Sequence, residues 1–436
     1  MWSKGAQSPP LLVQRGLLRG QGAASLIPLF MRKKLGLGLR KQIKIIAMKL
    51  LNLLVSTSFS LLTLVCVQAR DRNPSQGQTV PSASIYNKER PAKQYVRIAL
   101  LLDTSNSMDG LIDQAKAQLW DIVNEFSRAK CGNGGRPELQ IALYEYGNDN
   151  LPAQEGHIRQ VLGFSGDLDE ISQKLFSLTT NGGQEFCGQV IHSSLKQLEW
   201  GKNPDDLKMI FIAGNEPFDQ GTLDFRDAGS QALEQDVVVN TIFCGNYQQG
   251  INSLWRDGAT LSGGQYMAID HNRHVVHIDS PYDKLIIELN ARLNNTYISY
   301  GSMGREKKAM QYAQDNNAME LEEAVAVQRA VSKSSSLYKN SQWDLVDAVE
   351  ADELVLEKLD SGALPASLQG KSAPQIKAIV EAKRIEREKI QKEIQELNAK
   401  REIYLAKNQG LEKGELENAL MAAIRAQAAK KDYRWD

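Results

Sequence analysis

Oxygen-bearing side chains follow the first strongly apolar segment of the chain. Residues 95–102 read YVRIALLL, and behind them stand Asp103, Ser105 and Ser107, one carboxylate and two hydroxyls at alternate positions. Hard divalent cations accept such oxygen ligands while keeping water in their remaining positions. The G-x-G-x-x-G turn that a dinucleotide phosphate needs is missing here. The pattern indicates a divalent cation site, with Mg²⁺ as the first candidate and Mn²⁺ or Ca²⁺ as alternatives.

Strand and helix patterns alternate from residue 95 to residue 300. Apolar runs predict strands, and amphipathic stretches between them predict helices such as the one over 111–129. This alternation favours a doubly wound α/β fold, a mostly parallel sheet with helices on both faces. Ligands of such sheets gather at the carboxyl ends of the strands, and Asp103 lies at that edge.

The D-x-S-x-S pattern after the first strand resembles the metal-ion-dependent adhesion site of von Willebrand factor type A (VWA) domains. The resemblance covers residues 95–300, the predicted VWA domain, and includes the order of its elements. It implies that Ser105 and Ser107 bind the ion directly and that Asp103 acts largely through water. It also implies an open coordination position that accepts a carboxylate from a protein partner.

Two further loops depart from the family pattern. Where the family has G-T-x-T after a glycine, this chain has GGQEF, and where the family has T-D-G, this chain has AGNE. The expected threonine and aspartate ligands are therefore missing. Glu185 and Glu216, one in each altered loop, are candidates to restore the negative charge. Supporting oxygens stand in the same loops, on Thr179, Thr180, Gln184 and Asn215.

A structural role is the alternative for the first of these loops. Ser and Thr hydroxyls often cap a following helix or bond to neighbouring backbone groups, and Ser105 and Ser107 stand just before a predicted helix. In that case the scaffold keeps the loop without binding an ion.

The amino-terminal residues predict an exported protein. Residues 48–69 have a Lys, an apolar core and small residues at the end, as a signal peptide does. Residues 1–47 are basic and free of acidic residues, which predicts an over-called extension with synthesis beginning at Met48. Residues 70–94 are expected to be a flexible linker. The protein would be periplasmic or secreted; an uncleaved membrane anchor over 50–66 is the alternative.

Cleavage of this signal changes the charge of the chain. It would remove ten of the 52 basic residues and none of the 52 acidic ones, which leaves 42 basic residues. Such a balance argues against a nucleic-acid partner, since phosphate binding needs a basic surface.

Three cysteines would remain after cleavage. Cys187 opens a predicted helix and Cys244 ends a predicted strand, so both belong near the metal edge, whereas Cys131 lies at the opposite edge. In an oxidising compartment this placement favours a disulfide between Cys187 and Cys244, with free buried thiols as the alternative.

The carboxyl-terminal third has a different composition. Residues 301–373 are polar and are expected to be a linker with short helices, while 374–436 form a charged helical region. In that region Ile390 and Ile394 begin a heptad-like seam that Arg401 interrupts. The seam predicts either a coiled coil for self-association or a solvated helix that packs one stripe on the main domain.

These features predict a non-enzymatic protein-binding module of the cell envelope. The motifs supply no combination of nucleophile, base and orienting group. The expected partner is another envelope or extracellular protein that offers a carboxylate; a membrane is a partner only if the apolar segment stays uncleaved. The alternative is a metal-independent scaffold assembled through its carboxyl-terminal helices.

Overall fold

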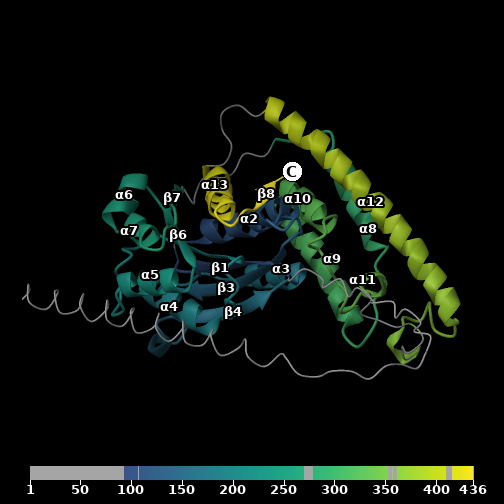
Figure 1. Cartoon of the computed structure of the whole chain (residues 1–436), viewed down its shortest axis with the longest axis horizontal. Coiled ribbons are helices and arrows are strands. Elements are labelled where there is room, and N and C mark those ends of the chain that lie inside the picture. The colour runs from purple at the N-terminus through teal and green to yellow at the C-terminus, as the bar shows by residue number, and fades with distance from the viewer. Residues whose placement is uncertain are drawn as a thin grey trace, which may run out of the picture. The chain divides into compact units, whose positions relative to one another are not determined.

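The computed structural model describes residues 93–106, 108–269, 278–351, 356, 361–408 and 415–435 (Figure 1). The predicted extension and signal peptide lie outside the described residues, as does nearly all of the expected linker. In the described ranges no helix combines the length and apolar character needed to cross a bilayer.

The core of the fold is a six-stranded sheet whose strands lie in the order β4-β3-β1-β5-β6-β7. Parallel pairs join β1 to β3 and β5, and β6 to β5 and β7, whereas β4 runs antiparallel to β3. The predicted doubly wound, mostly parallel α/β fold is therefore confirmed. The strands are β1 (Tyr95–Asp103), β3 (Glu138–Tyr146), β4 (Ile158–Ser165), β5 (Leu207–Gly214), β6 (Val238–Cys244) and β7 (Tyr266–Ile269).

Helices cover both faces of this sheet. Along β1, Ile98 and Leu100 belong to the apolar cluster on one face, and Ala99 and Leu101 belong to the cluster on the other. A strand that is buried on both faces is apolar throughout, which is why YVRIALLL shows no alternation. One cluster includes α2 (Asp109–Ser127) and α3 (Leu168–Phe176); the other includes α4 (Cys187–Gln197), α5 (Phe225–Glu234) and α7 (Trp255–Thr260). The short helix α6 (Tyr247–Asn252) precedes α7.

The carboxyl-terminal helices pack on the face that α2 covers. Ile390 and Ile394, on the long helix, and Ile424, near the end of the chain, are fully buried in that cluster. In Figure 1, α12 runs along α8, with which it is in contact. The final residues form β8, which pairs with the short strand β2 (Ala129–Lys130). These elements are α8 (Asp283–Asn294), α9 (Gly304–Leu321), α10 (Glu323–Lys333), α11 (Leu345–Glu350), α12 (Ala373–Asn408), α13 (Glu415–Ala429) and β8 (Arg434–Trp435).

Residues 301–373 differ from the polar linker that their composition suggested. Within them, α9 and α10 pack on the sheet domain, and Val327 and Ala330 are fully buried. Their polar side chains enter the interior as ion pairs. Arg329 is 1% exposed and lies 2.8 Å from Asp169 of α3 and 2.7 Å from Asp315 of α9. Charged side chains that are paired in this way can be buried. A polar composition therefore does not distinguish a linker from packed helices in this segment.

Candidate metal centre

Three of the predicted site residues meet at the carboxyl edge of the sheet. Asp103 ends β1, Ser105 follows it, and Glu185 comes from the loop before α4; all three are at most 5% exposed. The Ser105 N–H donates to Asp103 Oδ1 at 2.8 Å, which holds the carboxylate against its own loop. The structure thus brings together side chains that are 80 residues apart in the sequence.

Oxygens of these residues lack partners in the described part of the chain. Asp103 Oδ2, Ser105 Oγ and Glu185 Oε2 are buried, and none of them makes a hydrogen bond of good geometry to a described residue when both carboxylates are ionised. Buried polar atoms are almost always bonded, so three orphans in one place need an explanation. Either a proton or a bound cation must lie between the two carboxylates.

The electrostatics of the pair favour a proton when no cation is present. Burial raises the pKa of Asp103 to about 6, against the effect of bonds from Glu185 and Ser105. Burial and the neighbouring Asp103 charge raise the pKa of Glu185 to about 9. Glu185 therefore carries the proton at neutral pH and donates it to Asp103, and the pair holds one negative charge.

Two glycines make room for this pair. A Cβ on Gly147, whose φ is +78°, would lie 2.7 Å from Glu185 Cγ and 2.9 Å from Asp103 Oδ1. A Cβ on Gly214 would lie 2.6 Å from the hydroxyl of Tyr146 and 3.2 Å from Asp103 Oδ2. Neither glycine was predicted from the sequence, although each ends or directly follows a strand at the edge where ligands gather.

Asn148 holds the loops in register. Its Nδ2 donates to the carbonyl of Thr179 at 2.9 Å, and its Oδ1 accepts from the N–H of Asn150. Backbone bonds add to this, from Asn181 N–H to the Thr104 carbonyl and from Asp149 N–H to the Gly182 carbonyl. The candidate site is therefore built on four loops, and Asn148 is a positioning residue that stands outside the D-x-S-x-S motif.

The remaining predicted site residues lie around this pair or away from it. Glu216 is exposed and bonded to Gln220, and its charge raises the pKa of both buried carboxyls. Thr180 donates to Asp109 at the start of α2, and Thr179 and Gln184 are exposed. Asn215 is half-buried in the loop after β5. Ser107 lies outside the described residues.

The capping alternative does not account for Ser105. The N-cap of α2 is Met108, which makes no side-chain cap bond, and the Ser105 hydroxyl lies beside the Asp103 and Glu185 carboxyls without capping the helix. The described residues also contain no group of three or more His, Cys, Asp and Glu side chains placed to hold a metal. A cation here would depend on two carboxylates and on hydroxyl oxygen.

The predicted disulfide between Cys187 and Cys244 is wrong. Both thiols are free and buried, as is that of Cys131. Cys187 belongs to the apolar cluster on the α4 face, whereas Cys244 belongs to the cluster on the α2 face, so the sheet separates them. The sulfur of Cys187 instead lies 3.8 Å from the hydroxyl of Tyr146.

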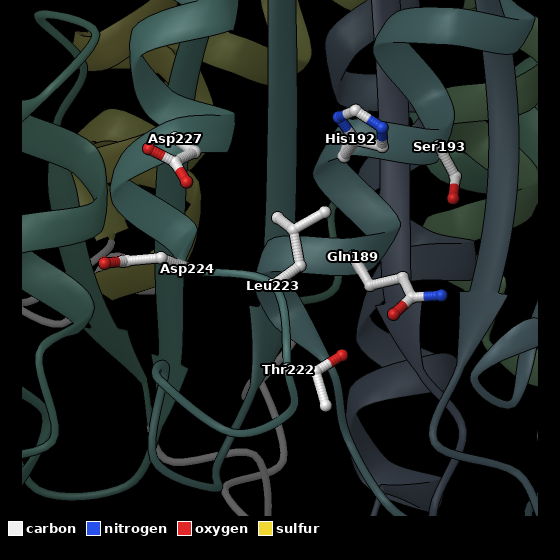
Figure 2. A pocket seen from close by; sticks show the side chains of 7 residues that line it. All are labelled: Gln189, His192, Ser193, Thr222, Leu223, Asp224 and Asp227. Atoms are coloured by element: carbon white, nitrogen blue, oxygen red, sulfur yellow. The ribbon is translucent and has the colours of Figure 1, made fainter.

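A separate hollow of about 580 Å³ lies between α4 and α5. Figure 2 shows Leu223 in its middle, with His192 on one side and Asp227 on the other. His192 Nδ1 lies 2.8 Å from Gln231 Oε1, and Asp224 caps α5. None of the predicted site residues lines this hollow, so it is distinct from the Asp103 centre.

No protein-family model and no curated protein matches the chain. Solved structures match part of it. BatB from Bacteroides thetaiotaomicron is 14% identical, with 40% of this chain and 90% of that chain covered and a TM-score of 0.31. The SpRpn10 VWA domain is 15% identical, with 40% and 88% covered and a TM-score of 0.31. Mussel byssus proximal thread matrix protein 1, with a zinc-occupied MIDAS motif, is 16% identical, with 40% and 42% covered and a TM-score of 0.31.

At these TM-scores and sequence identities, the similarity does not show to which family the chain belongs or what it does. The fold class stands on the strand order and strand directions of the sheet itself: a doubly wound α/β domain with a helical carboxyl-terminal region.

Proposed function

We propose that this chain is an exported, non-enzymatic protein-binding module that holds a divalent cation at a degenerate adhesion-type site. The observation that carries the proposal is the set of buried, unpartnered oxygens on Asp103, Ser105 and Glu185. Carboxylate and hydroxyl oxygens are the ligands that Mg²⁺ prefers, with Mn²⁺ or Ca²⁺ as alternatives. When bound, the cation supplies an open position for a carboxylate of a partner protein.

Each residue has a defined part in this proposal. Ser105, with Ser107, supplies hydroxyl oxygen, and Asp103 supplies charge at the centre of the site. Glu185 replaces the missing threonine, and it loses its proton when the cation binds. The exposed Glu216 adds negative charge at the rim, where it attracts the cation without being buried.

Calorimetric titration of the full chain with Mg²⁺ and with Mn²⁺ tests the cation. We expect binding by the wild type and a loss of at least about tenfold in affinity for Ser105→Ala and Glu185→Gln, since each removes one ligand oxygen or its charge. Glu155→Gln, an exposed carboxylate outside the site, is the matched control and should bind as the wild type does. No heat with either ion would contradict the proposal.

The proposed partner is an envelope or extracellular protein that presents an acidic side chain, and the proposed location is the periplasm or the cell exterior. Residues 48–69 support export by their signal-peptide pattern. Amino-terminal sequencing of the exported product tests this, and a mature end within residues 1–47 would contradict it. A pull-down from the envelope fraction, with and without chelator, tests the partner, because a cation-dependent partner should be lost with chelator.

A metal-independent scaffold is the second candidate. One observation favours it: Ile385 and Ile403, on the outer side of α12, are 55% and 57% exposed. They are 18 residues apart, or about five helical turns, so they lie on one face of the helix. Self-association through this face predicts a dimer that the double variant Ile385→Lys with Ile403→Lys converts to a monomer. Light scattering would measure it, and a monomeric wild type would exclude it.

A further inference from the structure

A second cavity, of about 600 Å³, lies under the long helix α12. Side chains from α2, α10, α12 and α13 line it, and these helices are labelled in Figure 1. On α2 the lining begins at Asp121, whereas the metal loop precedes Asp109. Twelve residues of helix separate the two, about 18 Å, so this cavity is not part of the Asp103 centre.

The cavity explains why polar residues interrupt the buried stripe of α12. Ile390 and Ile394 are fully buried, and the same stripe continues with Asn398, 7% exposed, and Arg401, 3% exposed. An arginine at such a position is costly unless its charge and donors are satisfied. Its Nε donates to Asp283 Oδ1 at 2.6 Å, but no described residue bonds to its two terminal nitrogens. Arg401 thus offers a partly unused guanidinium to the cavity that it lines.

Asn398 provides the complementary group. Its Nδ2 donates to Glu402 Oε1 at 3.1 Å, while its Oδ1 is buried and has no partner among the described residues. Asn398 lines the same cavity as Arg401, one turn away. The cavity therefore contains unused donors on Arg401 and an unused acceptor on Asn398.

The rest of the lining balances charge and adds an apolar wall. Arg128 pairs with Glu402 at 3.2 Å, and Arg425 pairs with Glu125. The side chains of Arg128 and Arg425 are 49% and 58% exposed, so Arg401, at 3%, is the buried guanidinium to which an anionic group can add bonds. Asp121 adds a carboxylate to the lining. The apolar part of the lining comes from α12 and α13, with Leu405, Ala406, Met421 and Ala422.

We propose that this cavity binds a free α-amino acid with an apolar side chain. The carboxylate accepts two bonds from the terminal nitrogens of Arg401, as planar carboxylates do. The ammonium donates to Asn398 Oδ1, near the carboxylate of Glu402. The side chain packs against Leu405 and Met421. The proposal does not depend on the cation site, and the volume is within the usual range for small-molecule sites.

Calorimetry on the full chain tests this, after unfolding and refolding to remove any ligand that copurifies. The probes are L-leucine and L-methionine, together with 4-methylpentanoate, which lacks the ammonium, and isoamylamine, which lacks the carboxylate. We expect at least one of the two amino acids to bind, and both single-charge analogues to bind at least about tenfold more weakly, since each loses a charge-assisted bond.

Two variants place the ligand. Arg401→Gln should weaken amino-acid binding at least about tenfold. Because this variant also removes the arginine that pairs with Asp283, Met421→Trp provides a second route: it fills the cavity from a half-buried position and leaves the ion pair intact. Arg384→Gln, on the same helix but outside the cavity, should bind as the wild type does. The proposal is overturned if neither amino acid binds, if 4-methylpentanoate binds as tightly, or if Met421→Trp leaves binding unchanged.

Discussion

Two regions of this molecule that bury carboxylates differ in their surroundings. Asp315, under the carboxyl-terminal helices, lies 2.7 Å from Arg329 and 2.8 Å from Lys333. Burial opposes its ionisation, but Lys333 and Arg329 hold its pKa well below the usual range. At the sheet edge, burial raises the pKa of Asp103 to about 6, and burial together with the charge of Asp103 raises the pKa of Glu185 to about 9. The first region contains its own cations, whereas none of the described cationic side chains acts on the second.

This difference indicates a structural role for the Asp315 cluster and a ligand-binding role for the Asp103 centre. In the Asp315 cluster the chain supplies both signs of charge, so the cluster can hold α3, α9 and α10 together without a ligand. At the Asp103 centre the described residues supply two carboxyls, a hydroxyl and a backbone N–H, and no cationic side chain acts on the pair. A site of that kind is incomplete until a proton or a cation occupies it, which is the physical basis of the proposed metal dependence.

The largest effect is expected in the complete cluster. Arg329→Met leaves Asp169 and Asp315 buried with one fewer cation, so we expect a loss of about 3–5 kcal/mol in the free energy of unfolding. Chemical denaturation measures it. Arg384→Met removes an arginine from the exposed side of α12 and should leave the transition where it is. Equal effects of the two variants would mean that the buried pairs do not hold these helices together.

The pH dependence of stability is expected to be of similar size. Without a cation, the folded protein keeps protons on Asp103 and Glu185 that the unfolded chain releases near pH 3.8 and 4.5. Because the folded pKa values are raised, this contribution is fully present at low pH and is lost as the pH rises. For Glu185 the decline runs from about pH 4.5 to about pH 9, at roughly 1.4 kcal/mol per pH unit for one proton.

Glu185→Gln is the variant that isolates this decline. The amide keeps the shape and a donor for Asp103 but cannot ionise, so the slope between pH 6 and pH 9 should largely vanish. Denaturation in chelator across this range measures it, with Glu155→Gln as the control. A wild type whose stability does not change between these pH values would show that the two carboxyls do not share a buried proton.

A smaller effect tests the packing around the pair. Gly214→Ala places a methyl group 2.6 Å from the Tyr146 hydroxyl, and we expect a loss of about 1–3 kcal/mol. Adding Tyr146→Phe removes the clashing oxygen, so the double variant should be less destabilised than the two single variants predict. Gly166→Ala, which meets only ordinary van der Waals contact, is the control. Strict additivity would contradict this geometry.

The smallest effect is expected for Glu216, at the rim of the Asp103 centre. Glu216 acts on the buried pair through its charge and is itself exposed, so Glu216→Gln should change stability by no more than about 0.5 kcal/mol. Its effect on Mg²⁺ affinity should be smaller than that of Glu185→Gln, because it removes attraction without removing a buried ligand. Titration of both variants side by side measures the ratio, and a larger loss for Glu216→Gln would reverse the assigned roles.

Sequence patterns anticipated the sheet domain because its signals are local. The apolar run before Asp103 and the spacing of the following helices reflect strands buried on both faces, so fold class and element order could be predicted. The proximity of Asp103 and Glu185 was also predictable, because both lie in loops that correspond to the metal-site loops of the family that the sequence resembles. The clearance at Gly214 and the bonds of Asn148 were not, because they depend on distances between loops.

The carboxyl-terminal region was harder to predict for a physical reason. Arg329, Lys333 and Arg401 look solvated in a sequence, and their burial depends on acidic partners up to 160 residues away. The predicted disulfide between Cys187 and Cys244 was wrong for a similar reason. Their order in the chain places both near one edge of the sheet, but it does not show that the two side chains lie on opposite faces.

The most direct test of the central claim counts protons. Mg²⁺ is titrated into the full chain at pH 7.5 in two buffers of different ionisation enthalpy, which yields the number of protons released per ion bound. If a cation displaces the proton on Glu185, the release should be close to one, and Glu185→Gln should release none. Binding without proton release, or no binding at all, would contradict the account.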